Sequence, residues 1–326
     1  MHGRVSGLVY AIYYPVLAAL GVAGNLVTIV ILSRGMCGLS RCITRYLMWM
    51  AVTDLLVLIT AVILDRISTL HFPVLFLHTT PVCSLRLALI FAARDSSVWL
   101  TVAFTFDRFV SICCQKLKSK YSNKETAAVV IGVICTVSCV KNIPMYFALE
   151  PLSIIDNVPW FCNLRWNFYS DVLWTMYNWM DHMLNPCAPF LLMILLNALT
   201  VRYILAANRA RRRVKGNVEE QIDSEMQNRR KSIVLLFTIS GSFLVLWATY
   251  VANFLFVRFV KSNYMTGSNP NNPRFIFQEC GVMLQLLSCC TNTCIYAGTQ
   301  RKFREELKKG LKFPLKLIGK KSEFIF

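Results

Sequence analysis

SSVWLTVAFTFDRFVSIC, residues 96–113, is the stretch that decides the fold. This apolar run carries Asp107-Arg108-Phe109 near its end, and the basic stretch QKLKSK, residues 115–120, follows shortly after it. A long apolar helix that ends in charge and is followed by lysines is typical of a segment leaving a membrane on its cytoplasmic side. Arg108 there can pair with the adjacent carboxylate or swing into a helix bundle, which gives a switch two arrangements. The alternative is an arginine that only reaches for the membrane surface from a helix end.

The composition of the chain supports a membrane protein. Of its 326 residues, 56% are hydrophobic and only 16% are charged, whereas soluble proteins carry about 25% charged residues. This excess of apolar residues argues against a disordered chain and against an ordinary soluble enzyme. The net charge of +18 would suggest nucleic acid in a soluble protein. In so apolar a chain it indicates basic loops beside anionic lipid, so we expect membrane lipids and no nucleic acid as partners.

Seven apolar segments have roughly the 20 residues that a helix needs to cross a bilayer. The third segment carries Arg86, Arg94 and Asp95, and the seventh carries several polar residues, which must face protein or a wet cavity. We therefore predict one all-α domain, a seven-transmembrane helix bundle. The predicted spans lie near 8–33, 43–66, 82–114, 125–148, 171–206, 228–262 and 271–298.

The distribution of Lys and Arg predicts the orientation. They gather in the first, third and fifth connections and in the tail, so the positive-inside rule places the N-terminus outside and the tail, 310–326, in the cytoplasm. We expect a multi-pass protein of the plasma membrane. Residues 300–309 form a short amphipathic eighth helix, because Phe303 and Leu307 share one face. The alternative is a solvated charged tail.

Two cysteines stand apart from the others, most of which lie in apolar runs as small hydrophobic residues. Cys83 lies 25 residues before Arg108, about 37 Å of helix, and so at the outer end of the third span. Cys162 lies in the outer loop between the fourth and fifth spans. A Cys83–Cys162 disulfide would hold that loop over the bundle, and two free thiols are the alternative.

Asp54 sits midway along the second span, where a lone carboxylate is costly unless it is paired or hydrated. Polar residues at similar depth on other spans are Asn25, Ser97, Ser288 and Asn292. Together they predict a wet polar pocket for a small cation such as sodium, the only cofactor we expect. A protonated Asp54 bonded to its neighbours explains the same residues equally well.

Several motifs in one order carry a family resemblance. The chain resembles the rhodopsin-like, or class A, G-protein-coupled receptors over nearly its whole length. The matching features are Gly24-Asn25, Met50–Asp54, Cys83, Asp107-Arg108-Phe109, Phe243 with Trp247, Asn292-Thr293-x-x-Tyr296 and Phe303-Arg304. The resemblance implies that Asp107, Arg108, Asn292 and Tyr296 act in an activation switch and that a heterotrimeric G protein is the partner.

Some residues depart from the family pattern. Residues 127–140 of the fourth span lack its usual Trp, and Thr249 stands where a Pro usually follows the Trp of the sixth span. Asn197 replaces the Tyr that meets the switch arginine, and Thr293 replaces the Pro of the seventh span. These departures leave the fold prediction intact and put ordinary activation in question.

Three stretches, 10–32, 96–113 and 235–247, resemble the group of receptors around probable G-protein coupled receptor 139. That resemblance implies ligands such as aromatic amino acids and, without support from the loops themselves, favours coupling to Gq/11. Ile90 occupies the place of the aspartate that amine receptors carry, which argues against an amine ligand.

The ligand residues that we predict are Arg94, Asp95, His182, Trp247 and Tyr250. An amino acid has an ammonium group for Asp95, a carboxylate for Arg94 and a ring to rest on Trp247 and Tyr250. The alternative is a structural Arg94–Asp95 network that touches no ligand.

Other function classes have less support. The outer loop, 149–169, with Trp160, Phe161 and Trp166, suits a short peptide as an alternative ligand. A channel or transporter is less favoured, since no internal repeat is visible. The scattered histidines have no spacing suited to a metal-dependent enzyme.

Overall fold

The computed structural model describes residues 4–71, 75–168, 170–214, 222–259 and 272–310. The predicted tail, 310–326, lies outside this part of the chain except for its first residue, and so does the end of the predicted sixth span beyond 259. Within the described residues, seven helices are long and apolar enough to cross a membrane. Helices satisfy their own backbone hydrogen bonds, which hydrocarbon cannot do for them. The predicted all-α bundle is therefore confirmed.

The helical spans lie within a few residues of the predicted segments. They are Gly7–Ser33, Arg41–Ile67, Thr80–Cys113, Lys124–Phe147, Val172–Arg209, Arg230–Val257 and Pro273–Thr299. The elements that build them are α1 (Arg4–Ser33), α2 (Arg41–Val57) with η1 (Leu58–Ile67), α4 (Thr80–Cys113), α6 (Lys124–Lys141) with η3 (Ile143–Phe147), α7 (Val172–His182) with η4 (Met183–Cys187) and α8 (Ala188–Val214), α9 (Ile222–Phe259) and α10 (Pro273–Thr299). Short connecting elements are α3 (Ser68–His71), η2 (Leu75–His78) and α5 (Gln115–Tyr121).

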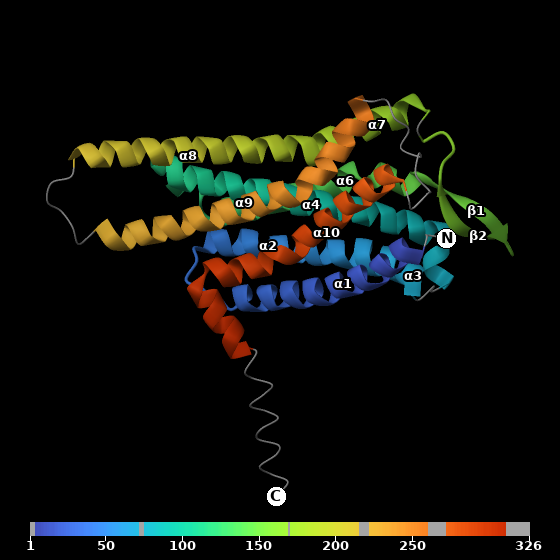
Figure 1. The fold of residues 1–326 in the computed structure, drawn as a ribbon, viewed down its shortest axis with the longest axis horizontal. Coiled ribbons are helices and arrows are strands. Elements are labelled where there is room, and N and C mark those ends of the chain that lie inside the picture. Colours follow the sequence, from blue (N-terminus) through green and yellow to red (C-terminus); the bar gives the residue numbers. More distant parts are fainter. Residues whose placement is uncertain (1–3, 72–74, 169, 215–221, 260–271, 311–326) are drawn as a thin grey trace, which may run out of the picture.

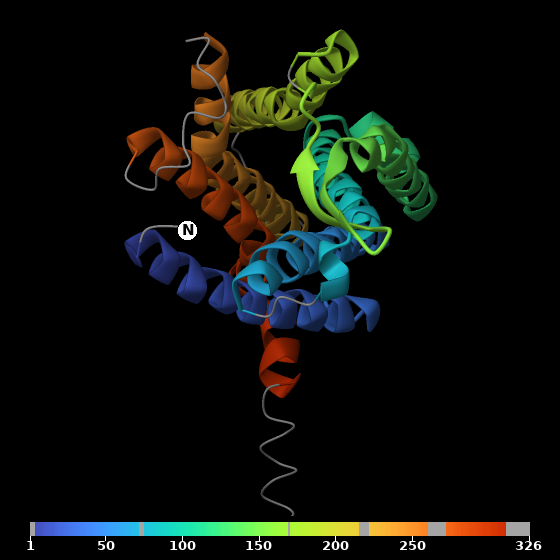
Figure 2. The ribbon, with the colours of Figure 1, turned by 90° about the vertical axis from the view of Figure 1, so that its right-hand side faces the viewer.

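The seven long helices run side by side along the longest axis of the molecule (Figures 1 and 2). One end of the bundle carries Cys83 and the other carries Arg108, and we call them the Cys83 end and the Arg108 end. Several helices begin at a polar residue whose side chain accepts a hydrogen bond from the first turn, such as Asn123 from the Thr126 amide and Asp171 from the Leu173 and Trp174 amides. These caps satisfy amides that the helix itself leaves open.

Two short strands lie at the Cys83 end, where the sequence analysis expected only a loop (Figure 1). β1 (Leu149–Ile155) pairs antiparallel with β2 (Val158–Leu164), with Leu149 opposite Leu164. Asp156 and Asn157 form the turn with positive φ angles of 51° and 60°. Asp and Asn tolerate this left-handed conformation better than most residues, and hairpin turns require it.

The helix at 301–310 begins where α10 ends and turns away from the bundle at the Arg108 end (Figure 1). Phe303 is fully buried and lies against the ring of Tyr296, with 5.9 Å between the ring centroids. Leu307 packs against the same cluster, and Arg301 stays exposed. The predicted amphipathic helix at 300–309 is thus present, one residue further along the chain.

Candidate functional site

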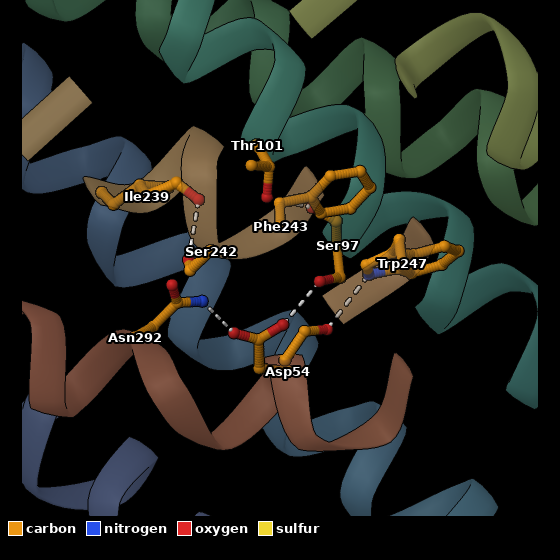
Figure 3. Close-up of a pocket in the computed structure, with 9 residues that line it drawn as sticks. Asp54, Ser97, Thr101, Ile239, Ser242, Phe243, Trp247 and Asn292 are labelled. Carbon is orange, nitrogen blue, oxygen red and sulfur yellow. Dashed lines mark hydrogen bonds between the residues drawn. The ribbon is translucent and has the colours of Figure 1, made fainter. Parts of the chain in front are cut away.

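A small polar pocket surrounds Asp54 in the middle of the bundle (Figure 3). Asp54 is buried, and its carboxylate accepts hydrogen bonds from Ser97 Oγ at 2.5 Å and Asn292 Nδ2 at 2.7 Å. These partners come from α4 and α10, so the pocket joins three helices around one negative charge. Its volume is about 20 Å³, room for one water-sized guest.

Four of the five residues predicted for this pocket line it: Asp54, Ser97, Ser288 and Asn292. Asn25 does not, because its amide group donates to the backbone carbonyls of Gly21 and Cys289. Thr101 and Ser242 also line the pocket and were not predicted. One carboxylate among neutral oxygens suits a small monovalent cation, since hard cations prefer oxygen ligands. Among the described residues no group of three or more His, Cys, Asp or Glu could hold a metal ion.

Trp247 forms the wall of this pocket nearest the Cys83 end. Its indole Nε1 donates to Ser288 Oγ at 3.2 Å, and its ring stacks on Phe243 with 4.9 Å between centroids. Tyr250 meets the same indole edge to face, with 5.8 Å between the ring centroids. The indole therefore contacts both the Asp54 pocket and Tyr250.

Arg108 is buried at the opposite end and is paired with its sequence neighbour. Its Nε donates to Asp107 Oδ2 at 3.0 Å, and its Nη2 bonds the same oxygen. A longer contact of 3.5 Å joins Arg108 Nη1 to Ser232 Oγ on α9. Asp107 Oδ1 accepts a further bond from the Cys42 thiol at 3.3 Å. Of the two arrangements foreseen for Arg108, the structure contains the one paired with the adjacent carboxylate.

The remaining predicted switch residues do not meet Arg108. Asn292 bonds to Asp54, and Tyr296 is buried with a hydroxyl that has no hydrogen-bond partner among the described residues. Asn197, the departure on the fifth span, donates from Nδ2 to Ser240 Oγ of α9 at 2.9 Å. The single proton of the Ser240 hydroxyl is shared between Asn197 Oδ1 at 3.0 Å and the Leu236 carbonyl at 2.8 Å. These two side chains join α8 to α9.

A larger cavity of about 270 Å³ opens toward the Cys83 end. One part of its wall is polar, with Arg94, Asn178, Asp181, His182 and Tyr250. The other part is apolar and is formed by Leu87, Phe91, Met145, Leu149, Leu164 and Phe168. Three of the five predicted ligand residues, Arg94, His182 and Tyr250, therefore line this cavity, whereas Asp95 and Trp247 do not.

Behind the polar wall lies a buried cluster of four charged side chains, which we call the charge quartet: Arg94, Asp95, Lys141 and Asp181. Lys141 Nζ lies 2.5 Å from Asp95 Oδ2 and 2.5 Å from Asp181 Oδ1. Arg94 lies further from both acids, at 3.8 Å from Asp95 and 3.5 Å from Asp181. The side chains are between 2% and 14% exposed, so four charges from three spans neutralise one another away from water.

Amide groups complete the surroundings of Asp95. Asn142 donates to its Oδ2 at 2.7 Å, and Asn185 donates to its Oδ1. Sequence reasoning predicted Arg94 and Asp95 and missed Lys141 and Asp181. The only signal for the latter two was a charge inside a predicted span.

A disulfide joins Cys83 of α4 to Cys162 of β2, as the sequence analysis predicted. Thr80 Oγ1 also donates to the carbonyl of Phe161 at 2.9 Å. Both contacts hold the hairpin against the end of α4. Leu149 and Leu164, which pair at the open end of the hairpin, reach the larger cavity.

Comparisons with known proteins agree with this architecture. The family model described as 7 transmembrane receptor (rhodopsin family) matches residues 24–296. An FMRFamide receptor of Drosophila melanogaster is 25% identical over 236 residues, which are 68% of this chain and 42% of that receptor. C-C chemokine receptor type 1 of Macaca fascicularis is 20% identical over 298 residues, 91% of this chain and 77% of the receptor. Probable G-protein coupled receptor 142 of Mus musculus is 28% identical over 148 residues, 45% of this chain and 38% of that protein.

Proposed function

The chain belongs to the rhodopsin family of seven-transmembrane receptors, and from this premise we propose that it converts binding of a small extracellular ligand into activation of a heterotrimeric G protein. Proteins of this family are receptors and not enzymes. One observation carries the proposal: a cavity with charged groups lies at one end of the bundle, and a buried, paired Arg108 lies at the other. Coupled changes at these two ends would link a ligand to a partner.

The Cys83 end is the extracellular one in this proposal, and the membrane is the plasma membrane. Disulfides persist in oxidising compartments, and Cys83 and Cys162 are joined at that end. The helix at 301–310, with exposed Arg301 and Lys309, then lies along the cytoplasmic surface beside anionic lipids. Most of the basic stretch at 209–215 has side chains that lie outside the described part of the chain.

An aromatic amino acid is the ligand that we propose first. The cavity of about 270 Å³ has a charged wall and an apolar wall, which suits a small molecule with an ionic head and a ring. Arg94 and Asp181 together offer a partner for each charge of an amino acid. Asp95 no longer fits the role of ammonium acceptor, because Lys141, Asn142 and Asn185 already bond its two oxygens.

A short peptide is the second candidate. The names of two relatives, an FMRFamide receptor and a chemokine receptor, refer to peptide and protein ligands. In this chain the hairpin carries exposed apolar residues, among them Leu152 and Ile154, at 67% and 68% exposure. A peptide end in the cavity would be able to contact that hairpin as well.

A sodium ion at Asp54 completes the proposal. The oxygens of Asp54, Ser97, Ser288 and Asn292 line the pocket and fit a cation of that size. Such an ion would supply a positive charge that stabilises the convergence of three helices on Asp54. Its effect on signalling would follow from different affinities for the two bundle arrangements, because a ligand shifts an equilibrium only by that difference. Coupling to Gq/11 is proposed from the family resemblance alone.

The test is a calcium and cyclic-AMP screen of cells that express the chain, against aromatic amino acids and short peptides. We expect a response to an aromatic amino acid that Arg94→Gln weakens at least about tenfold. Val129→Ala is the matched control, because Val129 is 64% exposed on the outer face of α6, away from the cavity. A response to peptides alone would support the second candidate, and a response unchanged by Arg94→Gln would move the ligand out of this cavity.

A further inference from the structure

Two members of the charge quartet, Lys141 and Asp95, lie outside the wall of the larger cavity, and two, Arg94 and Asp181, lie in it. The two shortest contacts of the quartet both involve Lys141, whose Nζ lies 2.5 Å from Asp95 and 2.5 Å from Asp181. Arg94 and Asp181, the two residues in the wall, are therefore positioned by Lys141 and Asp95, which lie outside it. Their charges toward the cavity depend on partners that a ligand does not touch.

Arg94 is the least satisfied member of the quartet. Its contacts to both acids exceed 3.4 Å, and its Nε has no hydrogen-bond partner among the described residues. Its guanidinium carbon lies 4.3 Å from the ring centroid of Phe91, which also lines the cavity. A guanidinium stacked in this way and short of an acceptor is ready for a carboxylate or carbonyl oxygen.

Asp181 offers the complementary group. Its Oδ1 is taken by Lys141, while the charged contact of its Oδ2 within the described part of the chain is the one of 3.5 Å with Arg94. When a ligand acceptor approaches Arg94, Lys141 stays in contact with both Asp181 and Asp95, and these three side chains carry one net negative charge. The cavity wall thus presents one loosely held cation beside one loosely held carboxylate oxygen.

The sum of the four charges is zero, and the quartet lies in a span region where uncompensated charge is costly. We propose that this balance makes the cavity select ligands with a zwitterionic head and no net charge, and that Lys141 and Asp95 set this selectivity from outside the cavity. The inference rests on the proposed ligand site and deepens it. Lys141 and Asp95 act as positioning residues, since they touch no ligand.

The consequence is a charge rule that variants can reverse. Asp95→Asn leaves the quartet with a surplus positive charge, so the affinity for a ligand with only a carboxylate rises. Lys141→Met leaves a surplus negative charge, so the affinity for a ligand with only an ammonium group rises. The double variant Asp95→Asn/Lys141→Met again sums to zero and favours the zwitterion. Lys141→Arg is the matched control, because it keeps the charge.

The experiment measures affinity on the purified full-length receptor, from the shift in melting temperature with probe concentration. The three probes share a phenyl ring and differ in the head: phenylalanine, phenethylamine and 3-phenylpropanoate. For the unchanged receptor and for Lys141→Arg we expect phenylalanine to bind at least about tenfold tighter than either other probe. We expect 3-phenylpropanoate to bind best to Asp95→Asn, phenethylamine to bind best to Lys141→Met, and phenylalanine to regain first place in the double variant.

Several results would overturn the inference. If the single variants lose affinity equally for all three probes and the double variant regains it, the quartet has a structural role and no role in selecting the ligand. The same rank order in every variant, or no binding of any probe to the unchanged receptor, also contradicts it. Where a single variant fails to reach the cell surface, the double variant decides: if it folds and does not rank phenylalanine first, the inference fails.

The proposed function fails in a different way. Nucleotide exchange on a purified G protein is measured with the same receptor preparations. If probe binding depends on charge as expected but no nucleotide exchange on the G protein follows, the signalling role is refuted and the selectivity rule still holds. A peptide response that is insensitive to both single variants would support a receptor while removing the rule.

Discussion

The contact between Asn197 and Ser240 was not predicted from the sequence, and it leads to a testable prediction about the stability of the bundle. Asn197 Nδ2 donates to Ser240 Oγ at 2.9 Å, the Ser240 hydroxyl lies 3.0 Å from Asn197 Oδ1, and Ser240 is fully buried. Ser240→Ala leaves the Asn197 amide without this partner, which costs about 1–3 kcal/mol. Replacing both residues together, as in Asn197→Leu/Ser240→Ala, removes both polar groups and costs less than the sum of the two single changes. We expect a coupling energy of about 1 kcal/mol in the double-mutant cycle.

The same pair joins α8 to α9, and Arg108 reaches α9 through Ser232. If opening around Arg108 requires α8 and α9 to separate, then losing about 1.4 kcal/mol from the closed arrangement raises the open population about tenfold. Basal nucleotide exchange on a G protein is therefore expected to rise about five- to tenfold in Ser240→Ala, with the melting temperature lowered.

Thr238→Val is the matched control. The Thr238 hydroxyl donates to the carbonyl of Val234 in its own helix, so its loss leaves the contact between α8 and α9 in place. Additive effects of the two single substitutions on stability, together with unchanged basal exchange, would refute the reasoning. Raised basal exchange in the control would refute it equally.

Three further predictions concern other parts of the molecule. Cys83→Ser removes the disulfide that holds the hairpin and is expected to cost about 2–5 kcal/mol of stability, seen as reduced surface expression; normal expression and ligand response would show that the hairpin stays in place without it. Asp54→Asn should abolish any dependence of basal signalling on sodium concentration, measured against potassium at equal ionic strength, and a persisting dependence would place the ion elsewhere. Burial raises the pKa of the Cys37 thiol, which packs in one cluster with Phe303, so maleimide should label Cys37 slowly at neutral pH. Phe303→Ala should speed this labelling about tenfold, measured by peptide mapping. An unchanged labelling rate would show that the helix at 301–310 stays docked without that ring.

The spans could be predicted because the bilayer imposes a length and a composition on each of them. Helix ends followed from the same rule to within a few residues. The hairpin was missed because β1 holds Pro151 and carries no regular alternation of apolar and polar residues. The signal that existed was Asp156-Asn157, a pair of residues that tolerate the left-handed turn of a hairpin.

The charge quartet shows why the site was predicted only in part. Arg94 and Asp95 are neighbours in sequence, which suggested that both face one ligand. Consecutive residues of a helix point about 100° apart, however. Arg94 therefore faces the cavity, while Asp95 faces Lys141 and Asn142 of the fourth span.

The partners of that pair lie far away in the chain. Lys141 and Asp181 follow Arg94 by 47 and 87 residues in the sequence, and no spacing rule connects such positions. A single lysine near the end of an apolar segment is usually read as a side chain that reaches the membrane surface. Only the packing of three spans shows that it faces inward instead.

The two cavities are close enough in the structure to affect one another. Tyr250 lines the larger cavity and Trp247 lines the Asp54 pocket, and their rings meet edge to face on adjacent turns of α9. The Trp247 indole is also tied to Ser288 of α10. A ligand that displaces Tyr250 would therefore press on a ring that is bonded to Ser288, one of the residues that line the Asp54 pocket. Such a push changes the equilibrium between bundle arrangements only if the ligand binds one arrangement more tightly than the other. In the proposed binding mode, a zwitterionic head at Arg94 and Asp181 would fix one end of the ligand, so that its other end would bear on Tyr250 across the cavity.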